Sequence, residues 1–468
     1  MLPVRHIHPC FKLSPYGSSA TVLYLDNASY LILHCINCLY LATRDRNYRY
    51  RKESGIEFAC EFLDQKGTAM CDRAQKGMGV YAVKVLDFAR AKGKELLTDE
   101  EAGLDPDAVP DIPQNSNKTR LSDKSVAIFI LDVRSNRTPY IKKGFDSYDY
   151  NGDFLGDAQW SWFEEATKRS TAAINIVVQG LQVHADRVGT VEMEFWSNFP
   201  TSQHRLYQAL LRDNVQNPIL ISGDVHQAML LRKDCRPVDR NKQLLERSKP
   251  LVELTTSGMT HAWGAKEHLC ARPGSLEICE MWHMKMAGHI AMNVAYWINS
   301  RRVWTDLIDL SSLTDRQHIT KGESKEGMQF ALELNFGELE IDWEQQVITA
   351  RILGKEAGAP PLLSSNWSFD FLSGGKAHGS SQFLQDAQFL EAYNQLEENG
   401  AIADDMNWVC ANYRGTPSSF IAAIGFILPT FIFVSMSMLP FFLPVVVLIA
   451  LAFRYRRRPN SSKKEKTF

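Results

Sequence analysis

The stretch PILISGDVHQAMLL, Pro218–Leu231, places Asp224 and His226 in a sharp turn after a predicted buried strand. A carboxylate and an imidazole two residues apart supply a hard oxygen and a borderline nitrogen, which suit iron, zinc or manganese. The carboxylate alone would also suit calcium. Two ligands do not hold a catalytic metal ion, so the sequence predicts half of a metal site at this turn.

Three more side chains stand where predicted apolar strands end. Arg134 follows SVAIFILD, His184 ends AAINIVVQGLQVHA, and His261 ends PLVELTTSGMTH. An arginine beside metal ions is what a phosphate monoester or diester needs, because the metals activate water while the guanidinium binds two phosphoryl oxygens. Structural roles stay open as well: a hydrogen-bonded histidine at position 184 or 261, and a buried pair between Asp132 and Arg134.

The elements that must position these side chains alternate in type. Four apolar runs read as strands, and two amphipathic stretches between them read as helices, GDFLGDAQWSWFEEATKRS and TSQHRLYQALLRDNV. The later segment FALELNFGELEIDWEQQVITARILG alternates as antiparallel strands do. This order predicts a layered α/β domain whose polar groups gather at the strand ends.

Composition excludes some classes of function. The chain has 468 residues, a net charge of −2 and no basic stripe interleaved with aromatic residues, so we expect no nucleic-acid-binding surface. Cys35 and Cys38 form a CxxC pair without a second pair, which does not predict a zinc site. Cys235, Cys270 and Cys279 could include a disulfide, which the sequence leaves open.

The C-terminal part carries a long uncharged stretch. Residues 420–453 contain no charged side chain and are followed by RYRRR. As a helix, about 34 residues would reach about 50 Å, more than the roughly 30 Å of bilayer hydrocarbon. We expect one transmembrane helix, a cytosolic basic tail at 454–468, and an extracellular or luminal domain. The sequons at Asn117, Asn136 and Asn366 agree with that orientation, whereas the first residues show no apolar stretch typical of an export signal.

Seven segments occur in an order that resembles PhoD-like alkaline phosphatases, members of the calcineurin-like metallophosphoesterase superfamily. They are FILDVRSNR, GDFLGDAQWSWFEE, QGLQVHADR, WSNFPTSQHRLYQAL, ILISGDVHQAML, VELTTSGMTHAW and NFGELEIDW. The resemblance covers residues 45–354 and implies a four-layer α/β/β/α sandwich with two metal ions (Fe, Ca, Zn or Mn) at the strand ends. It also implies that Asp224 and His226 are metal ligands and that Arg134 lies near the substrate, with His184 in the penultimate segment.

The earlier metal motifs of that family have no counterpart in this chain. An Asp-x-His-like strand end, a Gly-Asp-x-x-x-x-Asp segment and a Trp-Asp-Asp-His-Asp loop would precede residue 44, and none is found there. Two metal ions about 3.5–4 Å apart need about four to six ligands each. We therefore expect an N-terminally incomplete sandwich with open sheet edges that binds its metals weakly or not at all.

The expected organisation is an atypical segment at 1–44, a PhoD-like domain at 45–355, a juxtamembrane region at 356–419, the transmembrane helix and the basic tail. The expected function is a membrane-anchored, metal-dependent phosphatase or phosphodiesterase, inactive if its metal ligands are missing. Its partners would be a phosphate ester and membrane lipid. We expect Arg134 and His184 to be catalytic, and Arg134 and His261 to bind substrate. The alternative is a catalytically dead paralogue that acts as a membrane-bound binding or scaffold protein.

Overall fold

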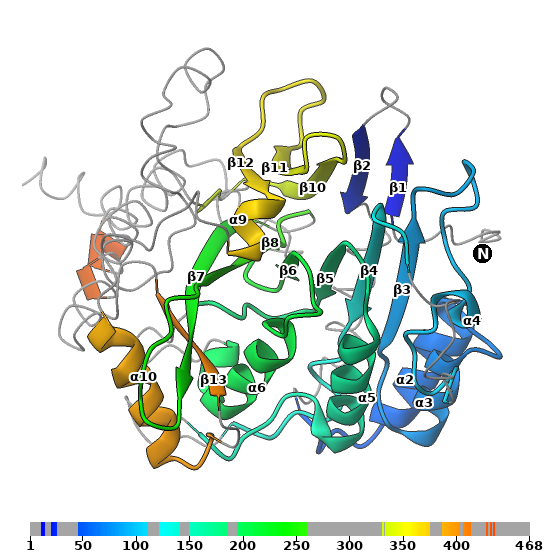
Figure 1. Ribbon diagram of the computed structural model, residues 1–468. Helices are drawn as coiled ribbons and strands as arrows, with labels where there is room; N and C mark the ends of the chain where they lie inside the picture. Colours follow the sequence, from blue (N-terminus) through cyan, green and yellow to red (C-terminus); the bar gives the residue numbers. More distant parts are fainter. Residues whose placement is uncertain are drawn as a thin grey trace, which may run out of the picture.

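The fold is described from a computed structural model. The described residues are 11–14, 20–25, 45–110, 121–140, 149–185, 194–259, 262, 330–331, 333–374, 386–402, 406–412, 427–428, 431–432 and 434–435. Their strands form an eight-stranded sheet and a five-stranded sheet, with helices around them, so this part of the chain is a mixed α/β structure (Figure 1).

The eight-stranded sheet has the order β13-β7-β8-β6-β5-β4-β3, with β9 paired to β7. Its strands are β3 (Ala82–Asp87), β4 (Ser125–Ile130), β5 (Ile174–Val178), β6 (Pro218–Ser222), β7 (Ala228–Asp239), β8 (Lys249–Thr256), β9 (Phe330–Ala331) and β13 (Met406–Asn412). Strands β4, β5, β6 and β8 run parallel to one another. All of their residues are buried, which explains why they read as continuous apolar runs rather than as alternating ones. Their carboxyl ends share one edge of the sheet, where the predicted site residues follow.

Two amphipathic helices cover one face of this sheet, as predicted. They are α5 (Gly156–Arg169) and α6 (Pro200–Leu210). Trp160, Phe163 and Ala166 of α5 recur at helical spacing and are buried in the same core as Phe129 of β4 and Leu206 of α6. This packing holds β4 and β6 in place beneath the helices.

The opposite face of the eight-stranded sheet packs against the five-stranded sheet. That second sheet has the order β1-β2-β10-β11-β12, made of β1 (Phe11–Ser14), β2 (Ala20–Leu25), β10 (Asn335–Asp342), β11 (Val347–Gly354) and β12 (Leu363–Ser368). Leu339 of β10 and Ile348 of β11 lie in one core with Ile176 and Ile219 of the larger sheet. The atypical segment 1–44 thus contributes two strands, and β2 pairs with β10.

The remaining described helices are short or lie at the sides. They are α2 (Arg51–Ile56), the π-helix η1 (Glu57–Phe62), α3 (Ala69–Lys76), α4 (Asp99–Ala102), the 3-10 helix η2 (Trp196–Asn198), α9 (Phe369–Ser373) and α10 (Asp386–Glu398). The outer face of the five-stranded sheet carries the ion pairs of Arg351 with Glu338 and Glu340. The described elements form three layers, helices and two sheets, and the fourth helical layer expected from the resemblance is not among them.

The prediction of a transmembrane helix at 420–453 is wrong. No helix among the residues that the structure describes is long and apolar enough to cross a membrane. The single-pass localisation, with an outward-facing domain and a cytosolic tail, rested on that helix and is corrected with it. Most of 420–453 and all of 454–468 lie outside the described residues.

Two disulfides fasten the described chain. Cys60 bonds to Cys71, which ties η1 to α3, and Cys235 bonds to Cys410, which ties β7 to β13. The two sulfurs of the second bond belong to residues directly opposite each other in the antiparallel pair. Cys35, Cys38, Cys270 and Cys279 lie outside the described residues, as does Asn117. Of the other two sequons, Asn366 is exposed on β12, whereas Asn136 is partly buried and donates to the Met78 carbonyl at 2.7 Å.

Candidate functional site

The turn after β6 holds Asp224 and His226 in an unusual backbone conformation. Both residues have positive φ, 71° and 54°, which non-glycine residues adopt rarely and at an energetic cost. The Val225 amide donates to the Gly223 carbonyl at 3.0 Å and closes the turn. Asp224 and His226 are both half-buried. Strained backbone of this kind concentrates at functional sites, which supports a role for this turn.

The turn after β4 is organised by the carboxylate of Asp132. This fully buried group accepts hydrogen bonds from the amides of Val80, Arg134 and Ser135 at 2.9–3.0 Å. The side chain of Gln159, on α5, bonds both the amide and the carbonyl of Asp132 at 2.8 Å. Asp132 therefore acts on the backbone, and it fixes the direction in which the Arg134 side chain leaves the strand.

Arg134 is the centre of a charged cluster at this edge of the sheet. Its guanidinium donates through Nη1 to Glu194 and reaches Asp224 Oδ1 through Nη2 at 3.4 Å. The side chain of Arg134 is only 6% exposed, while that of Asp224 is 37% exposed. Reduced solvation strengthens each ion pair relative to one in bulk water. The structure thus brings together two of the five predicted site residues, Arg134 and Asp224.

A second arginine reaches the same carboxylate. Arg137 Nη1 lies 3.3 Å from Glu194 Oε1, and its guanidinium carbon lies 4.1 Å from the centre of the Tyr140 ring. Burial raises the pKa of Tyr140 to about 12. Arg137 stands three residues after Arg134 within the quoted segment FILDVRSNR, so its spacing could have singled it out. Glu194 lies in a loop before η2, and no pattern in the sequence marks it.

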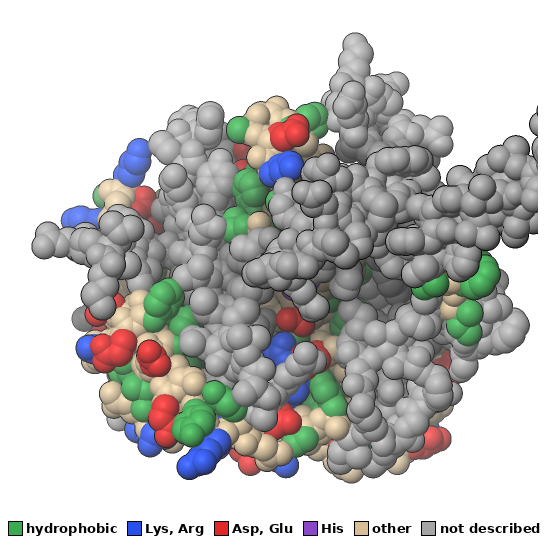
Figure 2. Space-filling model, turned by 180° about the vertical axis from the view of Figure 1, so that it is seen from behind, with side chains coloured by type: hydrophobic (Ala, Val, Ile, Leu, Met, Phe, Trp, Pro, Cys, Tyr) green, Lys and Arg blue, Asp and Glu red, His purple; other side chains and the backbone are tan. Residues whose placement is uncertain are grey.

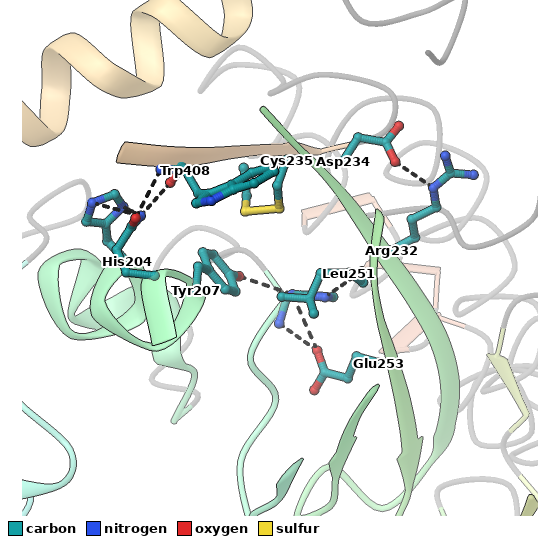
Figure 3. Close-up of a disulfide and its surroundings, with 11 residues drawn as sticks. His204, Tyr207, Arg232, Asp234, Cys235, Leu251, Glu253 and Trp408 are labelled. Atoms are coloured by element: carbon teal, nitrogen blue, oxygen red, sulfur yellow. Dashed lines mark hydrogen bonds and ion pairs between the residues drawn. A yellow bond between two sulfur atoms is a disulfide. The ribbon is translucent and has the colours of Figure 1, made fainter. Parts of the chain in front are cut away.

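His184 occupies a different environment. It is fully buried, its Nδ1 lies 3.1 Å from the Tyr207 hydroxyl, and its Nε2 lies 2.9 Å from the Leu251 carbonyl. Burial lowers the pKa of His184 well below its usual value, so the ring is neutral, with Nε2–H donating to Leu251 and Nδ1 accepting from Tyr207. The amide of His184 also donates to Glu253 at 2.6 Å. Figure 3 shows Tyr207, Leu251 and Glu253 beside the Cys235 disulfide. A catalytic role for His184 stays a prediction, and the described contacts are structural ones.

Glu253 of β8 joins the segments that follow β5 and end β6. Its carboxylate is fully buried and accepts from the amides of Val183 and His184 at 2.9 and 2.6 Å. Burial raises its pKa, although hydrogen bonds from Ser222 and from those amides act in the opposite direction. Ser222 is the last residue of β6 and also bonds Thr255 at 2.9 Å. Glu253 therefore ties the segment after β5 to the strand that ends two residues before Asp224.

The donors of the described residues do not amount to a metal centre. No group of three or more His, Cys, Asp or Glu side chains that could hold a metal ion occurs in the described ranges. Asp224 faces the cationic Arg134, and a positive charge at that position opposes a second cation. His261 lies outside the described residues. The described residues do not by themselves fit the two metal ions expected from the resemblance, and no catalytic step is derived through them.

The molecule carries charged side chains of both signs on the face seen from behind. Acidic and basic side chains of the described residues are interspersed there (Figure 2).

Comparisons with known proteins relate part of the chain to a phosphatase family. Residues 123–287 match the family model of PhoD-like phosphatase. A solved structure described as "Structure of PhoD" is similar to the chain at 15% sequence identity and a TM-score of 0.30, covering 62% of this chain and 50% of that one. The chain thus spans about half the length of that protein. No curated protein shows a significant match to the chain.

Proposed function

The chain carries a PhoD-like phosphatase domain over residues 123–287, and from this premise we propose that it acts on phosphate esters at the edge where β4 and β6 end. The observation that carries the proposal is the contact between Arg134 and Asp224, at 3.4 Å, from two separate strand ends of the matched region. The contact places a guanidinium, which can bind phosphoryl oxygens, beside a partly exposed carboxylate, which can act as a metal ligand.

Arg134 is the residue that would bind the phosphoryl group. A guanidinium binds two phosphoryl oxygens in a planar fork, a geometry that lysine cannot reproduce. Asp132 fixes the turn, and Glu194 and Asp224 restrain the guanidinium from two sides. Because the braced turn fixes the direction in which the Arg134 side chain leaves the strand, the guanidinium can stabilise charge that develops on the phosphoryl oxygens.

Asp224 and His226 are proposed to contribute ligands if metal ions take part. PhoD-like phosphatases depend on metal ions in general. A bound metal would supply activated water and polarise a phosphoryl oxygen. Asp224 and His226 offer one oxygen and one nitrogen donor toward such an ion. We propose that the described residues contribute metal ligands from the Asp224 turn and phosphoryl binding from Arg134. His184 and His261 keep their predicted roles as expectations.

Hydrolysis of p-nitrophenyl phosphate and bis-p-nitrophenyl phosphate tests the proposal. The full chain is assayed with added iron, calcium, zinc or manganese, beside Arg134→Lys and a control, Arg205→Lys. Arg205 pairs with Glu164 on the helical face. We expect hydrolysis of at least one ester, a loss of roughly tenfold or more in kcat/KM for Arg134→Lys because the fork is lost, and no change for the control.

The outcomes separate two functions. Ester binding without turnover would favour the alternative, a catalytically inactive paralogue that binds phosphate esters. Neither binding nor turnover, in a chain shown to be folded by circular dichroism, would overturn the proposal.

A further inference from the structure

Two arginines of one turn hold the same carboxylate. Arg134 Nη1 donates to Glu194 Oε2, and Arg137 Nη1 lies 3.3 Å from Glu194 Oε1, so each oxygen faces one guanidinium. Arg134 and Arg137 are 5% and 1% exposed. Their turn is braced by the Asp132 carboxylate and closed by the Arg137 amide, which donates to the Arg134 carbonyl at 3.3 Å. The two guanidiniums are therefore fixed by the fold and point at one place.

Arg137 has more donors than its partner uses. Its Nε and Nη1 atoms are buried and make no hydrogen bond among the described residues, so the 3.3 Å approach of Nη1 to Glu194 Oε1 is an ion pair without a hydrogen bond. Buried donors without an acceptor are rare in folded proteins, and each one calls for an explanation. The ring of Tyr140, 4.1 Å away, covers the guanidinium and fixes its position. A phosphate oxyanion presents more acceptor oxygens than a carboxylate does, so it would satisfy donors that Glu194 leaves unused.

Among the described residues, the charges of this cluster balance only while Glu194 is present. Arg134 and Arg137 contribute two positive charges, and Glu194 and Asp224 contribute two negative ones. An incoming phosphate would repel the carboxylates, so Glu194 must leave the two guanidiniums before a phosphate can take its place.

We propose that Arg134 and Arg137 form a two-arginine site for a phosphate oxyanion, and that Glu194 occupies this site as an internal competitor. The inference rests on the proposed function and extends it, because it assigns a second phosphate-binding arginine and a residue that weakens binding. Glu194 would thus set the affinity of the site for phosphate without touching the ester bond itself.

Binding of inorganic phosphate tests the proposal directly. Isothermal titration calorimetry on the full chain, in buffer without added metal, compares wild type with Glu194→Gln, which removes the charge and keeps the shape. Glu164→Gln is the matched control, because Glu164 also pairs with an arginine, Arg205, on another part of the molecule. We expect phosphate to bind at least about tenfold more tightly to Glu194→Gln, and the control to bind as wild type does. Adding Arg137→Met to Glu194→Gln should abolish the gain.

A second variant, Glu194→Asp, tests the proposal if Glu194→Gln does not fold. Glu194→Asp keeps the charge but withdraws the carboxylate by one methylene, and it should bind phosphate with an affinity between those of wild type and the glutamine variant. Unchanged or weaker phosphate binding in whichever Glu194 variant folds would overturn the proposal. Tighter phosphate binding without any ester hydrolysis would support this site and count against the catalytic function. Ester hydrolysis together with a phosphate affinity that does not change in the Glu194 variants would count against this site and support the catalytic function.

Discussion

Arg134 Nη2 and Asp224 Oδ1 lie 3.4 Å apart, although the two residues are separated by 90 positions in the chain. They meet because β4 and β6 both run parallel to β5 and flank it, so the turns that follow them leave the same edge of the sheet. The contact is therefore a consequence of topology, and a change in either residue should affect the other.

Metal content tests the donor set at the Asp224 turn. We expect the purified chain to hold less than one metal ion per molecule after desalting, because the two donors that the described residues offer at this turn bind a metal ion weakly. Asp224→Asn should lower the metal content further, whereas Asp157→Asn, at an exposed position of α5, should leave it unchanged. Inductively coupled plasma mass spectrometry measures both. Tight, stoichiometric metal that survives Asp224→Asn would contradict the assignment of this ligand.

The neutral state of His184 makes stability depend on pH. Burial lowers the pKa of His184 in the folded chain, so below about pH 6.5, the usual pKa of histidine, the unfolded chain binds a proton that the folded chain does not. The free energy of unfolding should then fall by up to roughly 1.4 kcal/mol for each pH unit. His184→Gln should show a shallower fall. Urea unfolding at about pH 7.5 and pH 5.5 gives the comparison, since both proteins share every other titrating group. If the free energy of unfolding falls equally in wild type and His184→Gln between these pH values, His184 binds a proton in the folded chain as it does in the unfolded chain.

The two disulfides should differ in their contribution to stability. The Cys235–Cys410 bond joins residues 175 positions apart, and the Cys60–Cys71 bond joins residues 11 apart. Loop-closure entropy predicts a loss of about 5 kcal/mol in the free energy of unfolding for the pair Cys235→Ser and Cys410→Ser, against about 3 kcal/mol for Cys60→Ser and Cys71→Ser. Denaturant titrations measure the free energy of unfolding of both double variants, and each double variant serves as the control for the other. A larger loss from the short-loop pair would mean that packing, rather than chain entropy, dominates.

Much of the layered sheet follows from the sequence, because its signals are local. The apolar runs of β4, β5, β6 and β8 mark buried parallel strands, and the periodicity of α5 and α6 marks their covering helices. The contact of Arg134 with Asp224 follows from the same reasoning, since both residues end parallel strands.

Contacts made by distant segments were not predictable in this way. Glu194 belongs to no periodic segment, and it pairs with Arg134 although the two residues are separated by 60 positions in the chain. The position of α10 beside β7 and β13 also became apparent only in the fold. Cys235 was a candidate for a disulfide, whereas Cys410 was not, because β13 joins the sheet from far along the chain. Apolar composition alone led to the incorrect membrane helix.

A double-mutant cycle on Arg134 and Asp224 tests the central claim most directly. The kcat/KM for p-nitrophenyl phosphate is measured for wild type, Arg134→Met, Asp224→Asn and the double variant. If the two residues form one phosphate-ester site, each single change lowers kcat/KM by roughly tenfold to a hundredfold, and the double variant is no worse than the more severe single one. Single variants with wild-type activity, or losses that simply multiply in the double variant, would contradict the account.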